Sequence, residues 1–477
     1  MNVLDVDVAV IGAGSAGLSA YRAARTHGGR VMLIEGGHLG TTCARVGCMP
    51  SKLLIAAAEA AHMLTVAPAL GVHPSAVRID GREVMARVRS ERDRFVGFVL
   101  ESIEQMPSED RLIGNARFVA PDRLRVDEHT EIRAARIVIA TGSSAVVPPM
   151  LQSLGERVVT NEEVFSWYDL PASVAVVGTG VIGLEIGQAL HRLGVRVTIF
   201  GRGSQLSGIK DPVVLASARQ VFEAELDLRL ECRLTAAKLC GDGVSITSAG
   251  VDGSERTEHF DLVLSAVGRT PNLQNLDLEH SGLVLKEGGI PLHDSHTMRC
   301  GESTIFLAGD ASDERPLLHE AVDQGRIAGD NAGRFPDVRP GLRRVPLAIA
   351  FTDPQIAVVG EGFHSLEAAR SASGQVEFAD QGRSRVMLQN HGVLRVYGDY
   401  ASGNFLGAEI CGPRAEHLAH LMAWSLQNGM TVSQMLDMPF YHPVVEEGLR
   451  TALRDLNDKL KHGMPAIEHC ADCTPGI

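Results

Sequence analysis

The stretch that decides the fold of this chain is residues 40–52, which read Gly40-Thr41-Thr42-Cys43-Ala44-Arg45-Val46-Gly47-Cys48-Met49-Pro50-Ser51-Lys52. Cys43 and Cys48 are five positions apart, and in a regular α-helix that spacing corresponds to a rise of about 7.5 Å. Disulfide-bonded Cα atoms normally lie within roughly 7 Å of each other, so a disulfide requires a distorted turn, which Gly47 permits. Pro50 suits the start of a helix, and the Ala- and Leu-rich residues 53–67 predict that helix.

The position of the two cysteines favours redox chemistry. A strained disulfide at the start of a helix is more easily reduced, and the helix N-terminus stabilises the thiolate that reduction releases. A structural disulfide is disfavoured because the N-terminal residues do not have the pattern of a signal peptide. Half of a zinc site is disfavoured because no other Cys/His pair has metal-ligand spacing with this one. We therefore expect a redox-active pair and no metal.

Residues 6–35 contain a complete dinucleotide-binding fingerprint. An apolar strand at 6–11 is followed by a glycine-rich turn, a helical run at 18–26 and a second strand that ends in Glu35. Glycines allow a tight turn and the close approach of a pyrophosphate to the helix N-terminus, and the terminal acid can bind a ribose. Because all four parts are present, this pattern is stronger than an isolated glycine motif.

A second fingerprint begins at residue 174 and predicts a second nucleotide site. Its turn is Gly178-Thr179-Gly180-Val181-Ile182-Gly183, and a helix and a strand follow. At the end of that strand, where an NAD site has an acid, this chain has Gly201 and then Arg202. An arginine there can accept the 2′-phosphate of NADP.

The C-x4-C pair followed by Met-Pro-Ser-Lys, just after a Rossmann start, resembles the FAD-dependent pyridine nucleotide–disulfide oxidoreductases. The resemblance covers nearly the whole chain, and the motifs occur in the family's order. It implies an α/β fold with two nested Rossmann-type nucleotide-binding domains and a C-terminal α+β dimerisation domain. One departure occurs at residues 40–43, where the family usually has Gly-Gly-Thr-Cys and this chain has Gly-Thr-Thr-Cys.

The resemblance also implies the domain order. Residues 1–147 form the first segment of the FAD-binding domain, and residues 148–270 form the NAD(P)-binding domain. Residues 271–344 return to the FAD domain, and residues 345–477 form the interface domain.

The expected site residues follow from the same resemblance. Cys48 is expected to face the flavin as a thiolate, while Cys43 exchanges with the substrate. Lys52 pairs with Glu185 near the flavin, although a solvent-exposed helix acid is an alternative for Glu185. Asp310 binds the ribityl hydroxyls, and the helix that begins near Leu318 directs its N-terminus at the flavin ring. The other expected FAD residues are Gly12, Gly14, Ser15, Ala16, Gly17, Glu35, Thr42, Ala140, Thr141, Gly142 and Gly268, and those for the nicotinamide cofactor are Gly178, Gly180, Gly183 and Arg202.

His442 and Glu447 match the family's His-Pro-x-x-x-Glu element. In the family this histidine acts on the disulfide of the partner subunit, which implies a homodimer with an active site shared across the interface. A base beside a thiol activates the thiolate, and a carboxylate orients the imidazole. We therefore expect His442 and Glu447 to be catalytic together with Cys43 and Cys48.

The choice between NAD and NADP stays open. Arg202 and the missing acid favour NADP(H), since charge complementarity to a phosphate is direct. Gly183 favours NAD(H), because NADP-using relatives often have alanine at this position.

Composition restricts the partners. The net charge of −13 argues against a nucleic-acid surface. We expect no apolar segment to reach the roughly 20 residues of a membrane span, and we expect a cytoplasmic enzyme.

The activity expected is electron exchange between NAD(P)(H), FAD, the Cys43–Cys48 pair and a small dithiol or disulfide. The motifs are most similar to those of dihydrolipoamide dehydrogenases, so dihydrolipoamide is the expected substrate. A glutathione-type reductase shares His442 and Arg202 but fits Ser51 less well. A mercuric reductase would lack the His442 element, and an FAD-bearing structural subunit is the non-enzymatic alternative. The C-terminal Cys470 and Cys473 are interpreted as part of a flexible tail rather than as an electron relay.

Overall fold

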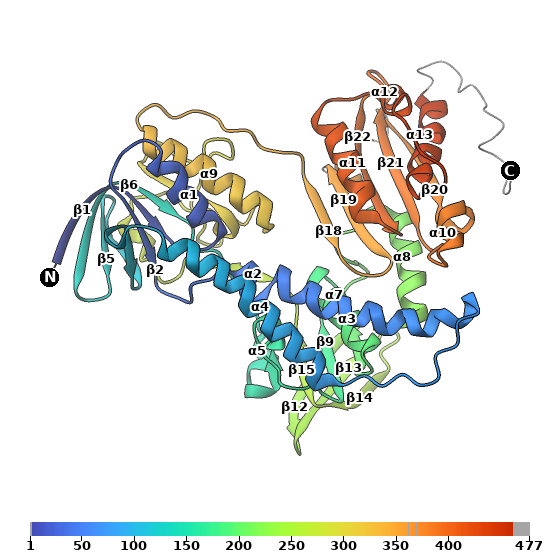
Figure 1. Cartoon of the computed structure of the whole chain (residues 1–477). Coiled ribbons are helices and arrows are strands. Elements are labelled where there is room, and N and C mark those ends of the chain that lie inside the picture. The colour runs from blue at the N-terminus through green and yellow to red at the C-terminus, as the bar shows by residue number, and fades with distance from the viewer. Residues whose placement is uncertain (1, 361, 368–369, 461–477) are drawn as a thin grey trace.

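The computed structural model describes residues 2–360, 362–367 and 370–460, and its N-terminal part is built on a mostly parallel sheet (Figure 1). In spatial order the strands are β3 (Arg111–Ile113), β2 (Val31–Glu35), β1 (Asn2–Ile11), β6 (Thr130–Ile139), β5 (Arg123–Val126) and β4 (Ala116–Ala120), and β17 (Ile305–Leu307) also pairs with β6. The inner strands are buried apolar runs, as parallel strands covered on both faces require. Because β17 joins this sheet from far along the chain, the domain is built from two separate segments.

Two helices from these separate segments lie side by side against the sheet, α1 (Ser15–Arg25) and α9 (Leu318–Arg334) (Figure 1). Glycine makes the close approach possible. A Cβ on Gly325 or Gly329 would lie 2.1 Å from the backbone oxygen of Ala16 or Ala20, respectively. The two helices therefore run in the same direction, with Ala16 near the start of α1 opposite Gly325 in the middle of α9.

A second parallel sheet follows in the chain. Its strands, in spatial order, are β11 (Asp227–Arg229), β10 (Arg196–Phe200), β9 (Ser173–Val177), β15 (Leu262–Ser265) and β8 (Val158–Val159). An antiparallel sheet of β12 (Arg233–Cys240), β13 (Gly243–Ala249) and β14 (Glu255–Phe260) accompanies it. The helices of this domain are α5 (Pro149–Gln152), α6 (Asn161–Val164), α7 (Val181–Arg192) and α8 (Pro212–Glu225).

The chain leaves the first domain and returns to it at one place. There β7 (Ser143–Ala145) pairs antiparallel with β16 (Arg269–Pro271), with Arg269 opposite Ala145. The expected domain limits near residues 148 and 270 lie close to this crossing and stay a prediction.

The C-terminal domain is an antiparallel sheet covered by helices (Figure 1). Its strands, in spatial order, are β18 (Leu347–Ala350), β19 (Gln355–Gly360), β22 (Phe405–Gly412), β21 (Val393–Asp399) and β20 (Ser371–Glu377). Its helices are α10 (Gly382–Val386), α11 (Ala415–Gln427), α12 (Val432–Leu436) and α13 (Glu446–Leu460). The expected α/β class, with two Rossmann-type domains and a C-terminal α+β domain, is confirmed.

One long helical segment connects the domains and corrects two expectations. It consists of α2 (Thr42–Val46), α3 (Cys48–Val66) and η1 (Ala67–Leu70), and it packs against α4 (Gly81–Glu104) and α7. Helix α3 begins at Cys48 rather than at residue 53, because the chain breaks from α2 only at Gly47. The expectation of no apolar segment of membrane-spanning length is also wrong. Because helix continues from the cysteines into the Ala- and Leu-rich run, Thr42–Leu70 reaches 29 residues with a mean hydropathy of 1.6 in its most apolar window. By length and composition alone this helix could span a membrane. A single helix of this kind is weak evidence that the protein does so.

Candidate active site

The two cysteines lie on either side of a sharp break in the helix. Cys43 is in α2, Cys48 is the first residue of α3, and Gly47 between the helices has φ −128° and ψ −115°. Both are free thiols in this structure. The hydrogen bond between them lowers the pKa of Cys48 to about 7, burial opposes this, and the positive charge of Lys52 lowers it further. The same hydrogen bond, together with burial, raises the pKa of Cys43. Of the two thiols, Cys48 is therefore the more acidic.

Thr41, at the position where the chain departs from the family's usual glycine, caps the helix that carries Cys43. Its side-chain oxygen accepts a hydrogen bond from Ala44 N at 3.3 Å. The backbone there has φ 60°, a conformation that favours glycine. This chain thus gains a cap for α2 at the cost of a strained backbone.

Lys52 is fixed by groups from two other domains. Its Nζ lies 2.9 Å and 3.1 Å from the carboxylate oxygens of Glu185 on α7, and 4.4 Å from the centre of the Phe351 ring. Glu185 is buried and also accepts the backbone N–H of Phe351 at 2.8 Å. The pair implied by the resemblance is therefore present, and Glu185 is not a solvent-exposed helix acid.

The first fingerprint forms a tight cradle around the start of α1. Gly12 has φ 105°, and a Cβ there would lie 2.3 Å from the backbone oxygen of Ala140 at the end of β6. Gly14, which precedes α1, has no atom within 4 Å of a Cβ position, so the space at the helix N-terminus is open. Glu35 accepts hydrogen bonds from Ala13 N at 2.6 Å and Gly37 N at 2.7 Å. This arrangement suits a pyrophosphate at the helix N-terminus and a ribose beside the acid.

An adjoining cleft of about 280 Å³ fits the adenosine part of FAD. It is lined by Ala13, Leu33, Glu35, Leu39, Ile103, Ser108, Arg111, Leu112 and Ile113. Within the described part of the chain, Arg111 Nε and Thr141 Oγ1 are buried without a hydrogen-bond partner. Arg111 lines this cleft, and Thr141 is one of the residues expected to bind FAD, so unpaired polar atoms and an open cleft in this region fit the cofactor.

The flavin end of this cradle is organised by the chain crossing. Asp310 lies in η5 (Gly309–Ser312), and its Oδ2 accepts a hydrogen bond from Ser143 Oγ at 2.8 Å. Ser143 in turn accepts from Arg269 Nε at 2.8 Å. Leu318 is the first residue of α9, so the N-terminus of this helix lies close in the chain to Asp310.

The second fingerprint repeats the geometry of the first. Gly178 has φ 119°, and a Cβ on Gly183 would lie 2.1 Å from the backbone oxygen of Gly178. Gly180, before α7, has open space at its Cβ position. Arg202 is exposed just after β10. The open turn can accept a second pyrophosphate, and Arg202 follows the strand whose end contacts the ribose in sites of this type.

His442 is oriented by Glu447. The imidazole Nδ1 lies 3.0 Å and 3.1 Å from the two carboxylate oxygens, and Glu447 also accepts from Val444 N and Arg450 Nη2. The histidine side chain is 71% exposed, which leaves Nε2 open to another group. Helix α13, which begins next to this element, lies far from α2 in Figure 1. Within one chain, His442 and the cysteines are therefore not brought together.

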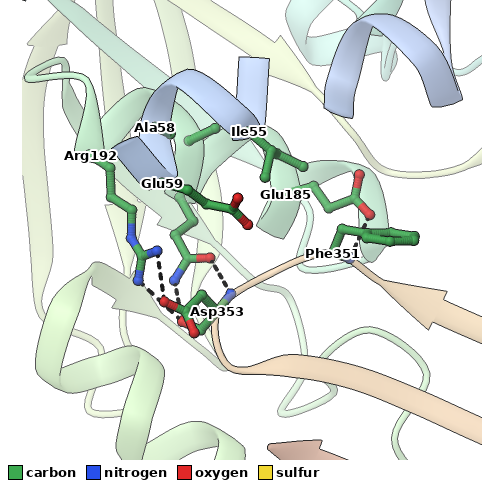
Figure 2. Close-up of a pocket in the computed structure, with 9 residues that line it drawn as sticks. Ile55, Ala58, Glu59, Glu185, Arg192, Phe351 and Asp353 are labelled. Carbon is green, nitrogen blue, oxygen red and sulfur yellow. Dashed lines mark hydrogen bonds and ion pairs between the residues drawn. The ribbon is translucent and has the colours of Figure 1, made fainter. Parts of the chain in front are cut away.

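Several residues that hold the site residues in place were not predicted from the sequence. Ser143 and Arg269 support Asp310, and Phe351 supports the Lys52–Glu185 pair. Figure 2 shows a further group beside Glu185, in which Arg192 reaches Asp353 with an Nη1–Oδ2 distance of 3.0 Å. Arg269 directly follows Gly268, which the resemblance predicts to bind FAD, so a signal existed for it. The other contacts join distant parts of the chain and left no local signal.

Comparison with protein families identifies the architecture. Residues 6–325 match the family model for pyridine nucleotide-disulphide oxidoreductases, and residues 346–453 match the dimerisation domain of the same family. The chain belongs to this family. Members use FAD and NAD(P)H, and the chain is accordingly an oxidoreductase with these cofactors.

Individual relatives have different substrates in their names. A mercuric reductase from Acidithiobacillus ferrooxidans is 30% identical over 96% of this chain and 84% of the relative. A dihydrolipoyl dehydrogenase from Haloferax volcanii is 30% identical over 94% of this chain and 95% of the relative. The crystal structure of LpdA from Mycobacterium tuberculosis superposes with a TM-score of 0.81 at 26% identity, covering 94% of this chain and 99% of that one.

Proposed function

We propose that this protein passes two electrons between NAD(P)(H) and a small dithiol or disulfide through the Cys43–Cys48 pair, and that its substrate is a dihydrolipoyl-type dithiol. The proposal includes a homodimer in which each active site takes its cysteines from one subunit and His442 from the other. The single observation that carries it is the His442–Glu447 contact at 3.0 Å, with Nε2 left open.

In this proposal the cofactor and the two cysteines have different roles. FAD, held by the first cradle, supplies two-electron transfer between the nicotinamide and the cysteine pair. Cys48, with its lowered pKa and its neighbour Lys52, is suited to remain a thiolate next to the cofactor. Cys43 is suited to exchange with the substrate, and because its pKa is raised, a base has to remove its proton when the enzyme reduces a disulfide.

The base in this proposal is His442. In the oxidation of a dithiol, the imidazole accepts the proton of the attacking substrate thiol, whose sulfur bonds to Cys43 while the Cys43–Cys48 bond breaks. The second substrate thiol then attacks the substrate sulfur of the mixed disulfide and closes the substrate disulfide. Cys43 is released and takes up the proton of that thiol, while Cys48 is left as the thiolate. Glu447 keeps Nδ1 protonated, so that Nε2 faces the thiols.

Steady-state assays with both nucleotides against lipoamide substrates, glutathione disulfide and Hg(II) test this proposal. We expect the highest kcat/KM with the lipoamide couple. A preference for glutathione disulfide would favour the glutathione-type reductase instead. Failure of NAD(P)H to bleach the flavin would leave only a structural, FAD-bearing role.

Reduction of Hg(II) is the second candidate, because two of the relatives with 30% identity are named mercuric reductases. Among the described residues no group of His, Cys, Asp and Glu is arranged to hold a metal. Cys470 and Cys473 lie outside the described residues. Truncation after Pro465 is expected to leave turnover with every small disulfide and with Hg(II) unchanged, whereas selective loss of Hg(II) turnover would assign the tail a relay function.

The cytoplasm stays the expected location, and fractionation of the expressing cell would test it.

A further inference from the structure

The loop after β10, residues 201–211, is attached to the second glycine-rich turn. Thr179 Oγ1 in that turn donates a hydrogen bond to the backbone oxygen of Gln205 at 2.8 Å. The backbone N–H of Ser207 donates to the oxygen of Thr179 at 2.9 Å. Leu206 and Ile209 are buried and anchor the loop. Arg202 therefore belongs to a segment that is hydrogen-bonded to the turn.

The far end of this loop is held by a buried carboxylate of another domain. Glu409, on β22, has no exposed surface. Its Oε2 accepts hydrogen bonds from the backbone N–H groups of Lys210 and Asp211, both at 2.8 Å, and its Oε1 accepts from Phe363 N at 2.8 Å. A buried carboxylate needs such donors to offset its desolvation. Because these donors are backbone groups, the carboxylate fixes the path of the chain itself.

Asp211 makes the reciprocal contact. Its carboxylate is also fully buried; it caps α8 and accepts hydrogen bonds from Arg395 Nε and Tyr397 Oη of β21, both at 3.0 Å. Burial, and then the charges of Glu409 and Asp211, raise the pKa of Tyr397, so its hydroxyl stays a donor. Each domain thus contributes one carboxylate that holds the other domain.

The same two domains are joined independently along α7. Gln188 Nε2 donates to the backbone oxygen of Asp353 at 2.7 Å, and Arg192 forms an ion pair with the Asp353 side chain, as Figure 2 shows. This attachment holds the body of the nucleotide-binding domain in place. Loss of the Glu409 carboxylate is therefore expected to loosen the loop without releasing the domain.

We propose that Glu409 is a positioning residue for the pyridine nucleotide. Its carboxylate fixes the 201–211 loop, and through that loop it sets the Gly178–Gly180 turn and the place of Arg202. This inference rests on the proposed assignment of the second fingerprint to NAD(P)(H).

The test is Glu409→Gln, which keeps the size of the side chain but leaves one acceptor oxygen in place of two. We expect the KM and the Kd for the preferred nicotinamide nucleotide to rise about tenfold, on the scale of one lost hydrogen bond. The kcat at saturating nucleotide, the FAD content and the KM for the disulfide substrate should stay unchanged. Hydrogen exchange at the amides of Lys210 and Asp211 should become faster, and bound nucleotide should restore protection.

The matched control is Glu377→Gln, which removes the same charge from an exposed position on β20 of the same sheet. It should change none of these quantities. If Glu409→Gln does not fold, Tyr397→Phe removes one donor to Asp211 and should raise the nucleotide KM in the same direction by a smaller factor.

The outcomes separate the two proposals. Faster exchange with an unchanged nucleotide KM would show that Glu409 is only structural and would overturn the inference, as would an equal rise of KM for every substrate. If the unmutated protein does not bind NAD(P)H in a direct titration, the proposed function itself fails, whatever Glu409 does.

Discussion

The two thiols of the redox pair differ in acidity because one donates its hydrogen bond to the other. This asymmetry predicts different phenotypes for their serine variants. Cys43→Ser leaves the Cys48 thiolate beside the cofactor, so the oxidised variant should show a long-wavelength thiolate–flavin charge-transfer band without added reductant. Cys48→Ser should show no such band. Absorption spectra of the purified variants decide this, and an oxidised Cys43→Ser protein without the band would contradict the assigned roles.

The low pKa of Cys48 also makes the charge-transfer band depend on pH. A pKa lowered to about 7 means that Cys48 is a thiolate above that pH and a thiol below it. The charge-transfer band of the two-electron-reduced enzyme should therefore weaken as the pH falls through about 7. A band that stays constant from pH 8 to the acid limit of stability would mean that another group carries the charge.

His442 is predicted to act only in thiol exchange. His442→Gln should bind FAD and dimerise normally but lose dithiol or disulfide turnover by roughly 10²–10⁴-fold. Reduction of the flavin by the nicotinamide should be nearly unchanged, because hydride transfer needs no proton from this side chain. Stopped-flow measurement of both half-reactions separates the steps, and slowed flavin reduction with intact exchange would make His442 structural.

At the scale of the element, we expect the loop that carries Arg202 to influence the choice of nucleotide. The exposed guanidinium can pair with a 2′-phosphate, whereas a carboxylate would repel it and bind ribose hydroxyls. Arg202→Glu should therefore shift the ratio of kcat/KM values from NADPH towards NADH. If the unmutated enzyme already prefers NADH and this substitution changes nothing, Arg202 does not face the ribose.

The parts of the site differ in how well the sequence predicts them. The glycine-rich turns were predictable because their constraint is local, as the contact of Gly183 with Gly178 within one turn illustrates. The His442–Glu447 contact was also within reach, since it spans five residues. The Ser143–Asp310 and Lys210–Glu409 contacts span 167 and 199 residues, and the motifs say nothing about such pairs. The apolar length of the redox helix was underestimated because the cysteines were placed before the helix rather than within it.

At the scale of the whole molecule, a site shared between subunits makes a prediction that no single chain can test. In a heterodimer of Cys43→Ser and His442→Gln subunits, one site carries both defects and the other carries neither. Such a heterodimer should recover about half of the activity of the unmutated dimer, since one of two symmetry-related sites is intact. Co-expression with two affinity tags isolates it. Activity no higher than that of the parent variants would show that each site is completed within one chain.

The antiparallel pairing of β7 with β16 has a consequence for how such molecules can be recombined. Because the chain leaves and re-enters the FAD domain at adjacent positions, residues 146–268 form an insertion with neighbouring ends. A foreign domain with similarly spaced ends could replace it without a change in the path of the FAD domain. A graft that keeps only this seam would still be incomplete. The foreign domain would lack the side chains that bind Asp353 and the backbone amides that bind Glu409. A working chimera therefore has to include those contact surfaces in the inserted domain.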